Sequence, residues 1–226
     1  MTNSKALIEA VDRLDTMIEN NLVIRGAWVK TDEGKERACL LAALVPACGV
    51  NASAASCPAD VLPAWLANLT PSIDDNGTIT AWPAMIREYA RLVRASTRID
   101  DAGWTRLDYR FRRIAVLEAL SRVPDTRTAV APIRVVVSLL DRAIAGAVPS
   151  DEEWGAARSA ARSAASAAYS AAYAADSAAY SAADSAASVA YSVAYSVAYS
   201  AARSAAWDRM TAALFAAWQG EIDANV

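Results

Sequence analysis

The chain has 226 residues, with 25 acidic and 22 basic side chains and a net charge of −3. That length is enough for one sizeable domain or two small ones around a buried core. The sequence contains no histidine, and 55 of its residues are alanine. The usual proton shuttle, triad base and zinc ligand are therefore missing, which argues against most hydrolases and metalloenzymes.

Residues 1–98 predict a mostly helical module with short β segments. Apolar residues four and three positions apart predict a first amphipathic helix: Leu7, Val11, Leu14 and Ile18. We expect short β segments at residues 22–24 and 27–29 and a turn at residues 31–34. The sequence thus predicts a small β-hairpin near the N-terminus.

The rest of this module contains an apolar run and a strong turn signal. Residues 38–45 are apolar throughout and predict a buried helix that ends at the proline that follows. A further helix is expected to begin at Pro58 or Ala59. Because residues 71–80 include the sequence Asp-Asn-Gly, we expect a short hairpin or loop there.

Residues 99–149 predict central helices, over residues 105–123 and 132–146, and the helical pattern already begins at Pro83. Arginines recur in this part at helical spacing: Arg87, Arg91, Arg94, Arg98, Arg106, Arg110 and Arg113. Residues 87–142 carry 12 basic and 7 acidic side chains, and each flank is net −4. These arginines are a candidate surface for an anionic partner. The alternative is a solvated face whose arginines pair with acidic side chains of the same chain.

Residues 150–226 predict an alanine-rich helical region. Ser150 and Glu153 form a capping box that predicts a helix start, and Gly220 is a natural C-cap residue. Between them, apolar pairs recur over residues 156–206 about every 3.8 residues. This period exceeds that of an α-helix, so the alanine face drifts around a straight helix. We expect a supercoiled long helix, a helical hairpin, or a rod shared in a homo-oligomer.

Six tyrosines accompany the alanine repeat: Tyr169, Tyr173, Tyr180, Tyr191, Tyr195 and Tyr199. One interpretation is that they frame a packed alanine seam, and the other is an aromatic recognition stripe. Ice binding by such a helix is disfavoured, because the repeat contains no threonine and its phase drifts.

The cysteines and the longest uncharged stretch bear on location. Cys39, Cys48 and Cys57 are odd in number and follow no leader sequence, so we expect reduced, buried thiols in a cytoplasmic protein. Residues 185–202 carry no charge but consist mainly of alanine, serine and tyrosine. Such a composition gives too little transfer free energy for stable insertion, so we expect no membrane partner.

Two stretches resemble known groups of proteins. About the first 95 residues, with Trp28 before a turn and ACLLAAL at residues 38–44, resemble an uncharacterised domain family of actinobacteria and their phages. Residues 139–169 are similar in composition to alanine-rich helical cassettes of phage and bacterial proteins, some of which are labelled immunity proteins. Neither resemblance implies a catalytic residue or a cofactor.

The sequence contains no phosphate-binding Gly-rich loop, nucleophile elbow or HExxH zinc motif. We therefore expect a mainly α-helical bundle that is not an enzyme and needs no cofactor or metal. It would act by contact with another protein or a second copy, as a phage or bacterial accessory factor of the immunity or anti-defence type. The alternative is a nucleic-acid-binding protein that uses the central arginines and whose affinity falls steeply with salt.

Overall fold

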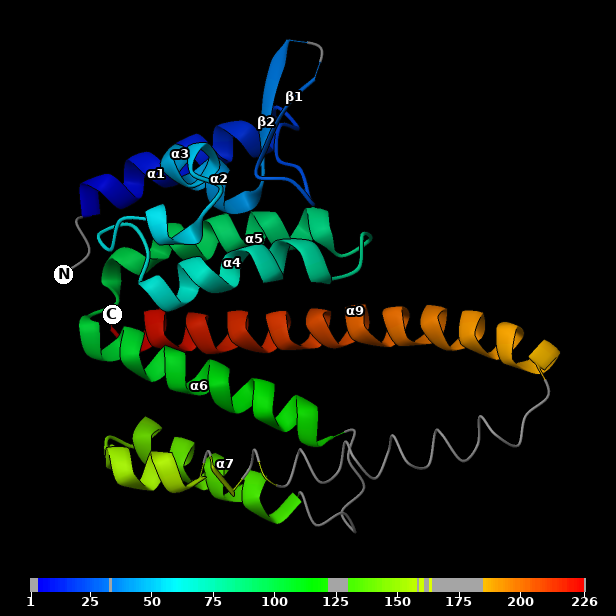
Figure 1. Cartoon of the computed structure of the whole chain (residues 1–226). Coiled ribbons are helices and arrows are strands. Elements are labelled where there is room, and N and C mark those ends of the chain that lie inside the picture. The colour runs from blue at the N-terminus through cyan, green and yellow to red at the C-terminus, as the bar shows by residue number, and fades with distance from the viewer. Residues whose placement is uncertain are drawn as a thin grey trace. The chain divides into compact units, whose positions relative to one another are not determined.

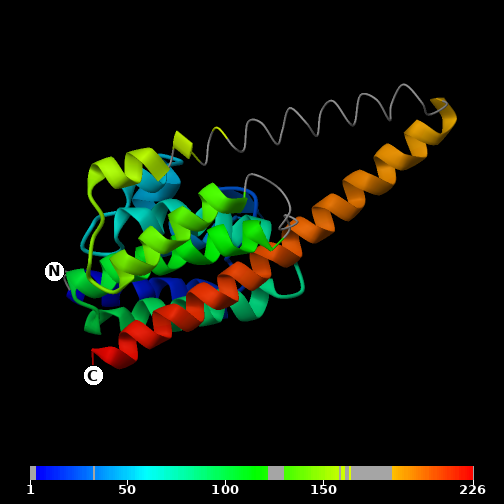
Figure 2. The same ribbon diagram turned by 90° about the horizontal axis from the view of Figure 1, so that it is seen from below.

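The computed structural model describes residues 4–32, 34–121, 130–157, 159–160, 163 and 185–225, without the side chains of residues 4, 119 and 185–201. These residues form a mainly α-helical protein with a small antiparallel hairpin near the N-terminus and a long C-terminal helix (Figure 1, Figure 2). The predicted fold class is thereby confirmed.

The chain divides into two compact units, which are described separately. The first unit comprises residues 1–108 and 203–226, and the second comprises residues 109–202. The module boundaries predicted after residues 98 and 149 concern segments of the sequence. They stay a prediction, because the grouping of residues in space does not test them.

The first unit begins with α1 (Ser4–Glu19), which packs against α2 (Leu40–Leu44) and α5 (Trp82–Ala95). The predicted apolar stripe of α1 is fully buried at three positions: Leu7, Val11 and Leu14. The guanidinium of Arg13 donates to the carbonyl oxygens of the last two residues of α2. A cation at a helix C-terminus satisfies carbonyl groups that have no partner within the helix, so α1 both covers and caps α2.

The hairpin consists of β1 (Val29–Asp32) and β2 (Lys35–Ala38) in antiparallel register. The β segments predicted over residues 22–24 and 27–29 are wrong, apart from one isolated bridge at Val23 and the start of β1. We predicted strands from apolar content, whereas the real strands are mostly polar and exposed. Gly34 lies in the turn between the two strands and has a φ of 72°. Because this conformation suits a tight hairpin turn, it favours the pairing of β1 with β2.

The apolar run after the hairpin forms the centre of the first unit. All five residues of α2 are buried, which confirms the predicted buried helix for residues 40–44, whereas Ala38 belongs to β2. The proline at position 46 ends α2 and begins α3 (Pro46–Val50), where it takes a first-turn position that needs no N–H donor. A short 3₁₀ turn, η1 (Ala54–Ser56), follows.

The next helix, α4 (Ala64–Asn76), differs from the prediction at both ends. It begins five or six residues later than predicted from Pro58 or Ala59, and it continues through Pro71. The predicted hairpin or loop over residues 71–80 is therefore wrong for its first half. Buried side chains on both sides of the proline hold the helix together: Leu66, Ala67, Thr70, Ile73 and Asp74. Tertiary burial thus outweighs the missing backbone donor of the proline.

The remaining elements of the first unit are α5, a 3₁₀ turn η2 (Ser96–Arg98), the beginning of α6 (Asp101–Leu120) and the end of α9 (Ser185–Ala224). The predicted stop of α9 at Gly220 is wrong, because the helix continues to Ala224. Glu221 and the isoleucine after it are 1% exposed. Because these two side chains are buried, the last helical turn makes packing contacts that would be lost if the helix ended at Gly220.

An aromatic cluster joins α5, α6 and α9 within the first unit. The ring of Trp218 meets the rings of Tyr89 and Trp104 edge-on, with centroids 5.8 Å apart in both pairs. The indole Nε1 of Trp218 donates to Oγ of Ser96 at 2.8 Å. The Tyr89 hydroxyl pairs with Oγ1 of Thr70 at 2.8 Å. Burial of these large rings, with hydrogen bonds for the polar atoms of Trp218 and Tyr89, holds the C-terminal segment of α9 in place.

The second unit contains the rest of α6 and α7 (Val130–Ile144). An ion pair of 2.5 Å between Arg113 and Asp141 joins these two helices. The predicted capping box is confirmed, because Glu153 N donates to Ser150 Oγ at 3.2 Å and Ser150 N donates to the Glu153 carboxylate at 2.8 Å. Helical residues 151–157 follow.

The alanine repeat is described only in part. From residue 185 onward it belongs to α9, which is a single helix of 40 residues. Most of residues 158–184 lie outside the described residues, so the choice between a long helix and a helical hairpin stays a prediction.

Candidate functional site

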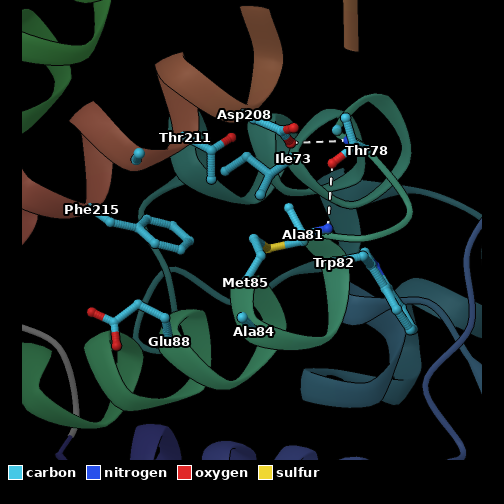
Figure 3. Close-up of a pocket in the computed structure, with 12 residues that line it drawn as sticks. Ile73, Thr78, Ala81, Trp82, Ala84, Met85, Glu88, Asp208, Thr211 and Phe215 are labelled. Atoms are coloured by element: carbon cyan, nitrogen blue, oxygen red, sulfur yellow. Dashed lines mark hydrogen bonds between the residues drawn. The ribbon is translucent and has the colours of Figure 1, made fainter. Parts of the chain in front are cut away.

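An open cavity of about 240 Å³ lies in the first unit, where the α4–α5 loop, α5 and α9 meet (Figure 3). Met85 and Phe215 reach into it from α5 and α9. We call this cavity the α5–α9 pocket, and it is lined by Ile73, Gly77, Thr78, Ala81, Trp82, Ala84, Met85, Glu88, Asp208, Thr211, Ala212 and Phe215. Most of these side chains are apolar, and the polar ones are few, which is typical of binding pockets.

The α4–α5 loop closes one end of the pocket through contact with α9. The backbone N–H of Thr78 donates to Oδ1 of Asp208 at 2.9 Å. A Cβ on Gly77 would lie 2.7 Å from the same oxygen, so a side chain at position 77 would push the Asp208 carboxylate aside. Oγ1 of Thr78 accepts the N–H of Ala81 at 3.3 Å. The loop therefore positions Asp208 at the pocket wall.

Contacts outside the pocket hold the same loop. The guanidinium of Arg25 donates to the Gly77 carbonyl oxygen at 2.8 Å, and that of Arg203 donates to Oδ1 of Asn76 at 2.9 Å. The N–H of Gly26 donates to Oδ1 of Asp75 at 2.8 Å. Because two segments, residues 25–26 and α9, hold the end of α4 and the loop that follows it, the pocket is already formed in the ligand-free protein.

Asp74 fixes the wall on the α5 side. Its carboxylate is 1% exposed and accepts two hydrogen bonds, from the backbone N–H of Leu40 at 3.0 Å and from Nε1 of Trp82 at 2.7 Å. Burial raises the pKa of Asp74 to about 6. The sequence predicts a hairpin or loop over residues 71–80, which include Asp74. The structure shows that Asp74 lies in α4 and caps the N-terminus of α2, which no local pattern indicates.

Two polar groups in the pocket have unused acceptor capacity. Oδ2 of Asp208 and the hydroxyl of Thr211 make no hydrogen bond among the described residues, and Asp208 makes no ion pair there. Glu88 differs, because both its oxygens accept from Arg91, at 2.8 and 2.7 Å. That contact lowers the pKa of Glu88. Asp208 is thus the carboxylate of this pocket that is open to a ligand.

The predicted arginine surface is largely occupied by contacts within each unit. In the first unit, Arg94 pairs with Asp12 and Asp15 at 2.7 Å each, and Arg106 pairs with Glu221 at 2.9 Å. Arg91 donates to Gln219 as well as to Glu88. Arg87 donates to the Pro83 carbonyl oxygen at 3.3 Å.

The other predicted arginines lie on two elements, η2 and α6. Arg98 lies on η2, Arg110 lies on α6, and Arg113 of the second unit pairs with Asp141. These contacts agree with the alternative interpretation, in which the arginines pair with acidic side chains of the same chain. A role of the arginines toward an anionic partner stays a prediction.

The tyrosine stripe falls outside the description of side chains. Tyr169, Tyr173 and Tyr180 lie outside the described residues. Tyr191, Tyr195 and Tyr199 belong to the backbone of α9, but their side chains are not described. Both interpretations of the stripe stay open.

The three thiols are free, and two of them are buried as expected. Burial raises the pKa of Cys39 and Cys48, and it raises the pKa of Cys57 to about 12. A thiol is nucleophilic and binds metal only as the thiolate, so these side chains are poor nucleophiles near neutral pH. Within the described ranges, no three Cys, Asp or Glu side chains come together in a way that suits a metal ion.

Comparison with known proteins does not assign a function to this pocket. No protein-family model, no curated protein and no solved structure matches the chain. Among the described residues, no helix has both the length and the apolar character needed to cross a membrane.

Proposed function

We propose that the protein is a non-enzymatic helical interaction protein that acts by protein–protein contact and holds a side chain of its partner in the α5–α9 pocket. The observation that carries this proposal is the preformed pocket itself. Its lining is mainly apolar, and two of its polar groups, Asp208 and Thr211, have spare acceptor capacity. Binding energy at protein interfaces concentrates in a few anchor side chains that fill such pockets.

The size of the pocket favours a side chain over a small-molecule ligand. Its volume of about 240 Å³ lies below the range of roughly 300–1,000 Å³ that is typical of small-molecule sites. The walls come from three segments that tertiary contacts hold in place. Binding to a preformed pocket avoids the cost of ordering it. The resemblance to phage and bacterial cassettes supports an accessory factor of the immunity or anti-defence type.

The test is capture of partners with two matched variants of α9. Ala212 lines the pocket and is exposed, whereas Ala213 beside it is exposed but does not line the pocket. Ala212→Trp fills the pocket, and Ala213→Trp adds the same ring outside it. We expect wild type and Ala213→Trp to capture the same protein after crosslinking in host cells, and Ala212→Trp to lose it. Equal capture by both variants contradicts the proposal.

A further inference from the structure

The polar groups of the α5–α9 pocket lie together, on one helix. Oδ2 of Asp208 and the hydroxyl of Thr211 belong to residues three positions apart on α9, so they lie on the same face. Both residues line the pocket, and Thr211 is 7% exposed. Figure 3 shows the two side chains next to each other, with Phe215 one turn further along the helix. The pocket therefore has an end that accepts hydrogen bonds and a body that is apolar.

A purely apolar occupant does not suit this arrangement. It would displace water from a carboxylate oxygen and a hydroxyl and leave them without partners. Burying a polar group without a hydrogen bond costs roughly 1–3 kcal/mol, and burying a charge costs more. An anionic occupant would face the Asp208 carboxylate directly. A cationic donor on an apolar stem satisfies both parts of the pocket.

The charge of the first unit points the same way. Its residues carry 17 acidic and 13 basic side chains, a net charge of −4. An acidic surface attracts a basic partner and orients it during encounter. Of the two carboxylates in the pocket, Glu88 is already neutralised by Arg91, which leaves Asp208 to bind the cation.

We infer that the anchor is an arginine side chain of the partner, and that its guanidinium binds Oδ2 of Asp208. This inference rests on the proposed function. Its three methylenes lie against Met85 and Phe215, and a further N–H donates to the Thr211 hydroxyl. Arginine fits better than lysine because its planar fork presents several donors at once, and its cation stacks on an aromatic ring. Charged hydrogen bonds of this kind are about twice as strong as neutral ones.

Side-chain analogues test the anchor without the partner. The probes are N-propylguanidinium, N-propylurea and n-butylammonium, which stand for arginine, its neutral isostere and lysine. They are titrated into the full-length protein, and the NMR shifts of the Thr78 amide and the Thr211 methyl are followed. We expect N-propylguanidinium to bind at least about tenfold more tightly than N-propylurea. Equal binding by the guanidinium and the urea, tighter binding by n-butylammonium, or no binding by any probe overturns the inference.

Variants assign the binding to Asp208. Asp208→Asn keeps an acceptor for the Thr78 N–H but replaces the open oxygen by an amide, so we expect about tenfold weaker guanidinium binding. Gly77→Ala displaces the same carboxylate and is expected to weaken binding too. Asp223→Asn is the control, because Asp223 is an exposed carboxylate of α9 outside the pocket. Unchanged affinity in both pocket variants overturns the inference.

The analogues and the capture experiment can fail separately. If the protein binds N-propylguanidinium no more tightly than N-propylurea, but Ala212→Trp still loses the captured protein, the proposed function stands and the arginine anchor is wrong. If the guanidinium binds at Asp208 but Ala212→Trp captures the same protein as wild type, the pocket chemistry is right and its use for that partner is wrong.

Discussion

The indole Nε1 of Trp82 donates to Oδ1 of Asp74 at 2.7 Å, while the other oxygen of Asp74 accepts the N–H of Leu40 at 3.0 Å. One buried carboxylate thus joins α4, the start of α5 and the start of α2. Leu40 is fully buried at the centre of the first unit, and Trp82 lines the α5–α9 pocket. The pocket wall and the core therefore share a single acceptor group.

Replacement of Asp74 tests that shared role. Asp74→Ala leaves two N–H donors without an acceptor, so we expect a loss of about 2–5 kcal/mol in the free energy of unfolding. Asp74→Asn keeps one acceptor and removes a buried charge, so its loss should be clearly smaller. Urea denaturation of the two variants at neutral pH measures both values. Equal losses contradict the assigned role of Asp74 as a hydrogen-bond acceptor.

The same carboxyl makes stability depend on pH. Its pKa is raised from 3.8 to about 6, so the folded chain holds this proton more tightly than the unfolded chain. The contribution of Asp74 is therefore fully present below about pH 4 and is lost as the pH rises through about 6. We expect wild type to lose stability over this window relative to Asp74→Asn. Parallel stability curves for the two proteins would contradict the raised pKa.

The ion pair between Arg106 and Glu221 fastens the end of α9. Glu221 is 1% exposed, and the Arg106 side chain is 35% exposed. Arg106→Ala removes one cation from this buried carboxylate, and we expect a loss of about 2–3 kcal/mol in the free energy of unfolding, below the value for a fully buried pair. The control is Arg87→Ala, because the contact that Arg87 makes among the described residues is to an exposed carbonyl oxygen. Similar losses in both variants would show that the pair does not hold α9.

Two tryptophans of the aromatic cluster differ in hydrogen bonding. Nε1 of Trp218 donates to Ser96, whereas Nε1 of Trp104 is buried and makes no hydrogen bond among the described residues. Trp218→Phe should therefore cost about 1–3 kcal/mol more than Trp104→Phe, because only the first variant breaks a buried hydrogen bond. Thermal unfolding of the matched pair measures the difference. The reverse order would contradict these assignments.

Two helical glycines are expected to respond in opposite directions to alanine. Gly220 of α9 has open space where a Cβ would lie, so Gly220→Ala should stabilise the protein by about 0.5–1 kcal/mol. At Gly103 of α6, a Cβ would lie 2.8 Å from Cγ2 of Ile99, so Gly103→Ala should destabilise it. Denaturation midpoints of the two variants check both signs. A shift in the same direction would contradict the packing of α6 described above.

Local patterns predicted the elements whose cause is local. The apolar period of α1, the buried run of α2 and the capping box at Ser150 all form as the sequence indicates. The predicted bounds of α4 and α9 were wrong. Tertiary burial of Ile73 and Glu221 outweighs the tendency of Pro71 and Gly220 to end a helix.

The pocket depends on contacts that no local pattern contains. Thr78 and Asp208 are 130 residues apart in the sequence, and Leu40 and Asp74 are 34 apart. A single sequence shows neither approach, so Asp208 carried no signal as a binding residue. The arginines gave a strong signal because of their spacing, and several of them pair with acidic side chains of their own unit.

The affinity of the captured partner for three forms of the full-length protein tests the central claim most directly. Isothermal titration of that partner into wild type, Ala213→Trp and Asp208→Asn measures the use of the pocket carboxylate in the complex itself. We predict the same Kd for wild type and Ala213→Trp, and a Kd at least about tenfold higher for Asp208→Asn. An unchanged Kd for Asp208→Asn would contradict a partner whose cationic side chain binds Asp208 in the α5–α9 pocket.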